Sequence, residues 1–145
     1  MLSRRTASHT LLTTAALLLL ACSQPNPQTA LEAAVQQLQN QLEARDTGAV
    51  MDLLDTKFRA QDEYDAAWAR KTMTLMFLRY AQVKVIALSR NSRIDPPGSP
   101  IGLTEAQVVV TGAQGLIPER VAPYAVTLEW RREGADWKLR DLRWE

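Results

Sequence analysis

The sequence is poor in the side chains that build disulfides and metal sites. Its 145 residues include one cysteine, Cys22, and one histidine, His9. An internal disulfide needs two thiols, and a zinc site of the usual Cys and His kind needs several such ligands. We therefore expect no internal disulfide, no metal and no resident cofactor.

The sequence also lacks a large excess of basic over acidic residues, or of acidic over basic residues. Lys and Arg number 17 against 16 Asp and Glu, which gives a formal charge of +1 at pH 7. Binding to a nucleic acid backbone needs basic side chains clustered along one surface, so we expect no nucleic acid partner. A chain of this length with 46% hydrophobic residues is typical of a single domain.

The apolar stretch near the start is too short to cross a membrane. Leu11–Leu20 spans ten residues, whereas a transmembrane helix needs about 20. The stretch follows Arg4 and Arg5 and precedes the small residue Ala21. This arrangement is typical of an export signal that is cleaved, and we assign residues 1–21 to it.

The residues after this stretch, Leu19-Leu20-Ala21-Cys22 and the segment 23–27 with its two prolines, resemble the lipobox and linker of bacterial lipoproteins. The resemblance implies cleavage between Ala21 and Cys22 and long acyl chains, such as palmitate, on the new N-terminal cysteine. Two or three chains hold a protein stably on a bilayer, because each buried CH₂ contributes about 0.8 kcal/mol. An ordinary secretory signal with a stray cysteine is the alternative.

Ser23 follows the cysteine. By resemblance to enterobacterial lipoproteins, a serine there permits sorting to the outer membrane. We therefore expect a lipid-anchored protein of the cell envelope, on the periplasmic side of the outer membrane. The expected organisation is a lipidated tether at residues 22–28 and one domain at residues 29–145.

Cleavage would remove Arg4, Arg5 and His9, leaving 124 residues with 15 basic and 16 acidic side chains. Such a mature chain lacks histidine, the commonest general base, and lacks a free thiol, the commonest soft nucleophile at neutral pH. Any catalysis would depend on carboxylates, tyrosine, lysine or hydroxyls.

Two helices are predicted at the start of the domain. The first begins at Thr29, because Thr29 and Glu32 fit a capping box. Its apolar seam recurs at helical spacing: Leu31, Val35, Leu38 and Leu42. A short second helix, capped by Asp46 or Thr47, runs through residues 50–54.

A connector is predicted at residues 55–61, followed by a third helix from Asp62 to about Tyr80. Asp62 is the expected N-cap, and the carboxylates of Asp62 and Asp65 can both accept from free backbone N–H groups of the first turn. The expected buried side of this helix consists of Trp68, Thr72, Leu75, Met76 and Arg79, widened by Phe77 and Leu78.

The second half of the domain has the period of two that is typical of strands. Strands are predicted at 83–88, 106–111, 121–132 and 137–144, with a proline-rich loop at 91–102. Residues 133–136 form a hairpin turn. In the last strand the apolar phase shifts between Leu139 and Leu142, which indicates a β-bulge near Arg140.

The order of these elements predicts an α+β fold, with three helices on one face of an antiparallel sheet of about four strands. Residues 42–46 leading into 49–54, and residues 133–139 with Trp144, resemble the nuclear transport factor 2-like superfamily, also called the ketosteroid isomerase-like fold. The resemblance implies a curved sheet and helices that enclose a cone-shaped pocket. Some members use this pocket for catalysis, and others only for binding or assembly.

The steroid isomerases of that superfamily use an aspartate base, which falls at Asp62 here. Their oxyanion-binding tyrosine falls at Leu38, which has no donor, and no acidic residue lies on the expected inward face of the strand that contains Tyr124 and Trp130. The oxyanion site, usually the largest catalytic contribution, is therefore missing. We interpret Asp62 as a helix cap and expect no enzyme activity.

Candidate pocket residues are Asp62, Tyr64, Trp68 and Tyr124. Aromatic residues at helical spacing are more often part of a core than of a site. The favoured functions are binding of a small apolar ligand or docking of an envelope protein. The alternative is an isomerase, dehydratase or hydrolase that uses Asp62 as its base. Similar proteins often form homodimers through the outer face of the sheet, so we expect this here too.

Overall fold

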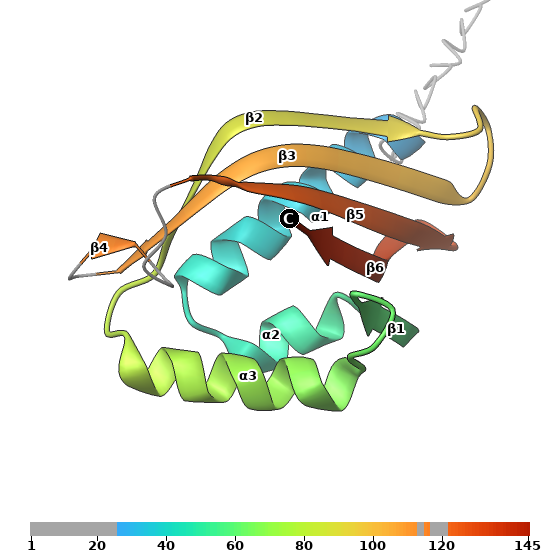
Figure 1. Ribbon diagram of the computed structural model, residues 1–145. Coiled ribbons are helices and arrows are strands. Elements are labelled where there is room, and N and C mark those ends of the chain that lie inside the picture. The colour runs from blue at the N-terminus through green and yellow to red at the C-terminus, as the bar shows by residue number, and fades with distance from the viewer. Residues whose placement is uncertain (1–25, 113–114, 117–121) are drawn as a thin grey trace, which may run out of the picture.

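The computed structural model describes residues 26–112, 115–116 and 122–145. The predicted export signal, its cleavage after Ala21 and the lipidation of Cys22 lie outside these residues. Within them, three helices and a curved sheet form an α+β domain, as predicted (Figure 1). No helix in the described part of the chain has both the length and the hydrophobicity to span a membrane.

Helix α1, Pro27–Glu43, begins two residues before the predicted start. Its N-cap is Asn26, whose Oδ1 accepts from the backbone N of Thr29 at 2.8 Å. The predicted capping box at Thr29 is therefore wrong. Asn26 is the N-cap, and Pro27 occupies the first helical position, which proline favours. The predicted seam is confirmed, since Leu31, Val35 and Leu38 are buried.

Helix α2, Thr47–Asp52, is capped by Asp46, whose Oδ1 accepts from the N of Ala49 at 3.0 Å. The predicted connector that follows is a strand, β1, Leu54–Ala60. It pairs in parallel with the last strand, β6, Asp136–Trp144. The sheet is therefore mixed, and the prediction of a purely antiparallel sheet is wrong.

A tight turn, not a helix, follows β1. Gln61 and Asp62 both have left-handed backbone conformations, with φ of 53° and 58°. The Gln61 side chain donates to the carbonyl O of Trp144 at 2.9 Å and accepts from its N at 3.1 Å, which ties the turn to β6. Helix α3, Ala66–Arg79, begins later, with Asp65 as its N-cap. Asp62 is therefore not the helix cap that we predicted.

The sheet has the strand order β1-β6-β5-β3-β2, with the two-residue β4, Gly115–Leu116, beside β3. The other strands are β2, Lys84–Ile94; β3, Ile101–Gly112; and β5, Tyr124–Glu133. Residues 91–94 and 101–102, predicted as loop, belong to β2 and β3, and residues 91–94 pair with residues 102–105.

Two local predictions in the last hairpin are confirmed. Glu133 pairs with Asp136 across a two-residue turn in which Gly134 has φ of 60°, a conformation that favours glycine. The pairing then shifts by one residue at Arg140, which is the predicted bulge.

The core lies where α1, α2 and β1 meet the inner face of β5 and β6. Its largest fully buried side chain is Trp130, packed among residues such as Leu31, Phe58 and Leu139. Helix α3 contributes only Ala69 to the buried residues of the described chain and crosses below the central strands of the sheet (Figure 1). The predicted buried side of α3 is therefore partly wrong, because Leu75 is 58% and Leu78 is 81% exposed.

Candidate functional site

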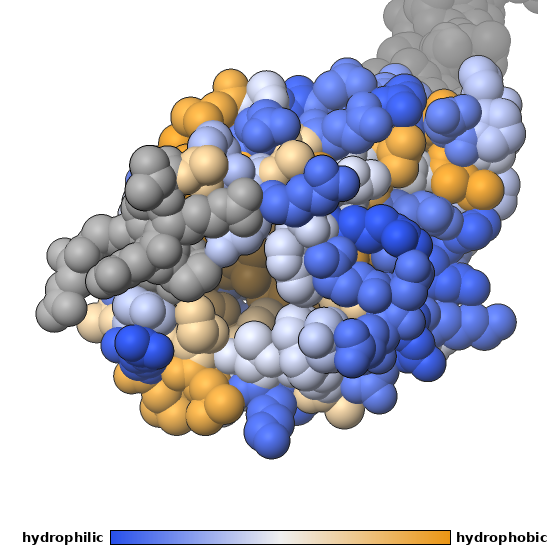
Figure 2. Space-filling model, viewed as in Figure 1, coloured by the Kyte–Doolittle hydropathy of each residue, from blue (hydrophilic) through white to orange (hydrophobic). Residues whose placement is uncertain are grey.

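A cavity of about 330 Å³ lies between the inner face of the sheet and the three helices. Its size is within the range of small-molecule sites. Figure 2 shows the molecular surface hollowed above α3, with apolar side chains visible inside the hollow. Helix α3 contacts the sheet at β1 and, through Trp68, at Trp144 of β6, and the cavity lies between this helix and the central strands.

Strand alternation explains why the wall of the cavity is apolar. On the central strand β3, Ala106, Val108 and Val110 point inward, and on β5 Val126 and Leu128 do so. Helix α1 adds Val35, Leu38 and Leu42, and α3 adds Trp68, Ala69, Thr72 and Met73. The period-two pattern of the sequence therefore forms the wall of a cavity over part of the sheet, instead of a filled core.

Four polar side chains line the described wall: Gln39, Thr72, Arg90 and Thr104. Two of them are engaged within the protein. The Thr104 hydroxyl is bonded to the Ser92 hydroxyl at 2.9 Å and accepts from the Trp130 indole N–H at 3.1 Å. Gln39 donates its amide N–H to the carbonyl O of Val85 at 2.9 Å.

The other two have fewer partners among the described residues, although polar atoms form almost none of the cavity surface. Thr72 is part of the wall, and its hydroxyl makes no hydrogen bond to another described residue. Arg90 donates from Nη1 to the amide oxygen of Gln36 at 3.1 Å, and no described carboxylate lies within ion-pair distance of it. Among the described residues, no acidic side chain lines the cavity.

The structure brings two of the predicted site residues together. The Trp68 ring lines the cavity and stacks on the Tyr64 ring, with centroids 4.4 Å apart and planes at 20°. On its other side, the Trp144 ring lies at 6.4 Å and 11°. Tyr64 and Tyr124 are not part of the described wall. The three stacked rings link the start of α3 to β6.

Asp62 lies away from the cavity, with its side chain 67% exposed. Arg143 donates from Nη2 to its carboxylate at 2.6 Å. This hydrogen bond, and then the charge of Asp141, raise the pKa of Arg143 above its ordinary value. Asp62 therefore forms an exposed ion pair and does not supply a base to the cavity. Leu38, at the position of the isomerase tyrosine, lines the wall.

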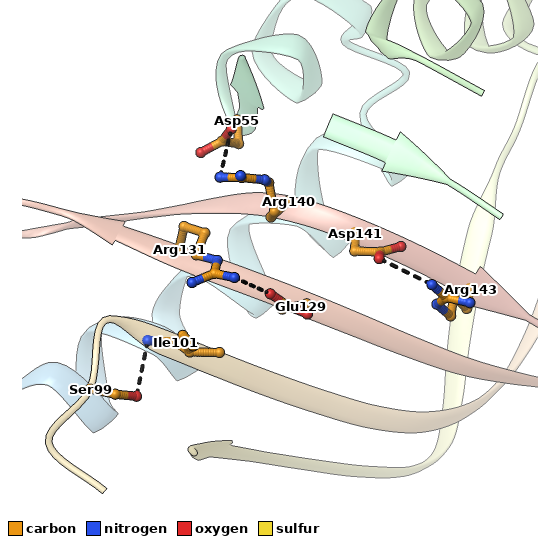
Figure 3. Close-up of polar contacts among 8 residues, drawn as sticks. All are labelled: Asp55, Ser99, Ile101, Glu129, Arg131, Arg140, Asp141 and Arg143. Atoms are coloured by element: carbon orange, nitrogen blue, oxygen red, sulfur yellow. Dashed lines mark hydrogen bonds and ion pairs between the residues drawn. The ribbon is translucent and has the colours of Figure 1, made fainter. Parts of the chain in front are cut away.

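The buried carboxylate of the described chain is Asp55, which the sequence analysis placed in a connector. It is 5% exposed, and its Oδ1 accepts from the N of Lys57 at 2.7 Å and from Arg140 at 3.4 Å. Figure 3 shows Arg140 of β6 directed at Asp55 of β1. Asp55 is not part of the cavity wall, and its pair with Arg140 joins β1 to β6.

Arg90 is a charged wall residue that was not among the predicted pocket residues. Strict alternation from Val85 and Ala87 would place it on the outer face of β2. The pairing shifts between Ala87 and Ser89, however, so Leu88 is an extra residue and Arg90 pairs with the inward-facing Ala106. No apolar phase shift marks this bulge in the sequence.

No protein-family model matches this chain, and no curated protein matches it by sequence. Several solved structures match its fold. Bd1075 of Bdellovibrio bacteriovorus has a TM-score of 0.69 at 13% identity over 81% of this chain, which spans 40% of that chain. A nuclear transport factor 2-like protein of unknown function from Pseudomonas putida has a TM-score of 0.66 at 9% identity, covering 81% of this chain and 84% of that one.

A candidate ketosteroid isomerase from Shewanella frigidimarina has a TM-score of 0.63 at 14% identity, covering 83% of this chain and 98% of that one. These matches show that the domain has the nuclear transport factor 2-like, or ketosteroid isomerase-like, fold. A fold of this kind is compatible with enzymes and with binding proteins, so function must be argued from the site.

Proposed function

We propose that this protein is a non-catalytic binding protein of the cell envelope, which takes a small, largely apolar ligand into the cavity beneath the sheet. The observation that carries the proposal is the apolar cavity itself, with no acidic side chain in its described wall. A domain that served only as a docking module would have no need of such a space.

The catalytic alternative has less support from the geometry. An isomerase, dehydratase or hydrolase of this fold would need a carboxylate base inside the cavity and donors for the developing oxyanion. The candidate base, Asp62, is exposed and paired with Arg143, and Leu38 offers no donor. Protein docking keeps one supporting observation, because Leu75, Leu78, Ile86 and Leu88 are large, apolar and exposed.

The cavity volume limits the size of the ligand. Water occupies about 30 Å³ per molecule in the liquid, so a cavity of about 330 Å³ holds a group the size of roughly 11 water molecules. The buried part of the ligand should therefore have on the order of a dozen non-hydrogen atoms.

A cavity-filling variant tests the proposal. Every buried hydrophobic residue of the described core lies between Leu31 and Leu139, so a chain that begins at Ser23 keeps the core whole. We expect this chain to bind the neutral apolar probe N-phenyl-1-naphthylamine saturably. Ala106→Leu, which adds volume inside the cavity, should weaken binding about tenfold or more.

The matched control is Ala125→Leu. Ala125 precedes Val126, the residue that pairs with Ala106, but its side chain lies on the outer face of the sheet. This substitution should leave the fluorescence titration unchanged. Absence of saturable binding by the unsubstituted chain, or equal weakening by both variants, would contradict the proposal.

We also propose that a lipid on Cys22 anchors the domain to the outer membrane, on its periplasmic side. Helix α1 begins at Pro27, so few residues would separate the lipid from the folded domain. Mass spectrometry of the N-terminal peptide from the native membrane fraction should show acyl chains on Cys22, and Cys22→Ser should release the protein from that fraction. An unmodified Cys22, or a soluble wild-type protein, would contradict the anchor.

A further inference from the structure

We propose that the ligand is a single-chain amphiphile with a carboxylate head group, whose tail fills the cavity and whose head group pairs with Arg90. This inference rests on the proposed ligand-binding function and names the chemical class of the ligand. It starts from an arginine in a wall that is otherwise built almost entirely from apolar residues.

The bulge in β2 places Arg90 in the wall. Because Leu88 is an extra residue in the pairing with β3, the side chains beyond it change faces. Ser92 is two residues after Arg90 and therefore lies on the same face of β2. Its hydroxyl is hydrogen-bonded to that of the inward-facing Thr104, so both Ser92 and Arg90 face inward. Without the bulge, Arg90 would point away from the cavity.

Arg90 has no carboxylate partner among the described residues. A guanidinium has five N–H donors, and the one hydrogen bond of Arg90 goes to the neutral amide oxygen of Gln36. The carboxylates on the same helix are engaged elsewhere: Glu32 accepts from Gln28, and Glu43 accepts from the backbone N of Val85. Neither of these two carboxylates therefore compensates the positive charge of Arg90.

The neighbouring arginine on β2 shows the contrast. Arg93 donates to Glu105 at 3.0 Å and also lies 3.7 Å from Asp95, and it is not part of the cavity wall. Of the two arginines on this strand, the one that faces the cavity lacks a carboxylate, and the one that faces outward has two. A carboxylate brought by a ligand would complete the first pair.

The location of Arg90 fits a head group and not a tail. Its side chain lines the cavity, but Arg90 is itself exposed, and its guanidinium donates to Gln36, an exposed residue of α1. A carboxylate there would make charge-assisted hydrogen bonds without complete removal from water. The apolar wall beyond Arg90 would take an alkyl tail.

The test compares decanoate with 1-decanol, two ligands with the same tail length and different head groups. Calorimetric titration of the chain that begins at Ser23 should show tighter binding of decanoate. Arg90→Gln should weaken decanoate binding about tenfold, as expected for loss of a hydrogen bond to a charged group. It should change 1-decanol binding by less than about twofold.

Arg93→Gln is the control on the same strand and should affect neither ligand. Equal affinity for decanoate and 1-decanol, or equal weakening of both by Arg90→Gln, would overturn the carboxylate assignment while leaving the apolar binding function intact. Failure of the unsubstituted chain to bind either ligand, or the neutral naphthylamine probe, would overturn the proposed function as well.

Discussion

Asp55 and Asp62 both pair with an arginine of β6, but they differ in exposure. Asp55 is buried and accepts from Arg140 and from the backbone of Lys57, whereas Asp62 is largely exposed and accepts from Arg143. Burial strengthens a charged hydrogen bond and makes loss of one partner costly. Solvent and salt screen the exposed pair.

The substitution Asp55→Asn should therefore lower the free energy of unfolding by about 1–3 kcal/mol. The matched substitution Asp62→Asn should cost less than about 1 kcal/mol, because it breaks an exposed pair and because asparagine tolerates the left-handed backbone at that position. Urea unfolding followed by circular dichroism measures both. A larger loss for Asp62→Asn than for Asp55→Asn would contradict this explanation.

Helix α3 forms the lower wall of the cavity, and a single side chain from outside the helix holds its C-terminal end. Arg45, in the turn after α1, donates from Nη1 to the carbonyl oxygens of Phe77 at 3.1 Å and Tyr80 at 3.3 Å. A cation at the last carbonyls of a helix stabilises its end. The rest of this end has few buried contacts, as the exposure of Leu75 and Leu78 indicates.

Arg45→Met keeps most of the side-chain length and removes these bonds. We expect faster amide hydrogen exchange over the last turn of α3 and faster release of a cavity ligand, with a loss of about 0.5–1 kcal/mol in global stability. Hydrogen exchange with mass spectrometry and stopped-flow displacement measure these effects. Arg70→Met, at the exposed start of α3, is the control, and an equal effect of the two variants would refute the role of Arg45.

The elements that the sequence predicted best are those with strong local signals. The apolar seam of α1, the cap at Asp46, the Gly134 turn and the bulge at Arg140 each follow from a few adjacent residues. Strand β1 was missed because its pattern is mostly polar and because its partner, β6, lies about 80 residues later. The start of α3 was misplaced because the turn at Gln61 is fixed by Trp144, also distant in sequence.

At the scale of the whole molecule, homodimerisation through the outer face of the sheet stays a prediction. That face carries the Arg131–Glu129 pair and a polar hollow lined by residues such as Asn91 and Gln107. A dimer formed there would depend on polar contacts and weaken as salt rises. Light scattering should show a dimer that dissociates with salt, and a monomer over a wide concentration range would contradict the prediction.

The sequence alone determined the α+β class, the inward-facing residues of β5, and the scarcity of thiol and imidazole groups, with one cysteine and one histidine. These properties depend on composition and on periodicity over a few residues, which are local. Only the tertiary structure decided that a cavity remains between α3 and the central strands, that Asp62 lies outside it, and that the Arg90 side chain lines its wall. The physical reason is that these features depend on contacts and pairing registers between distant segments, which local patterns do not encode.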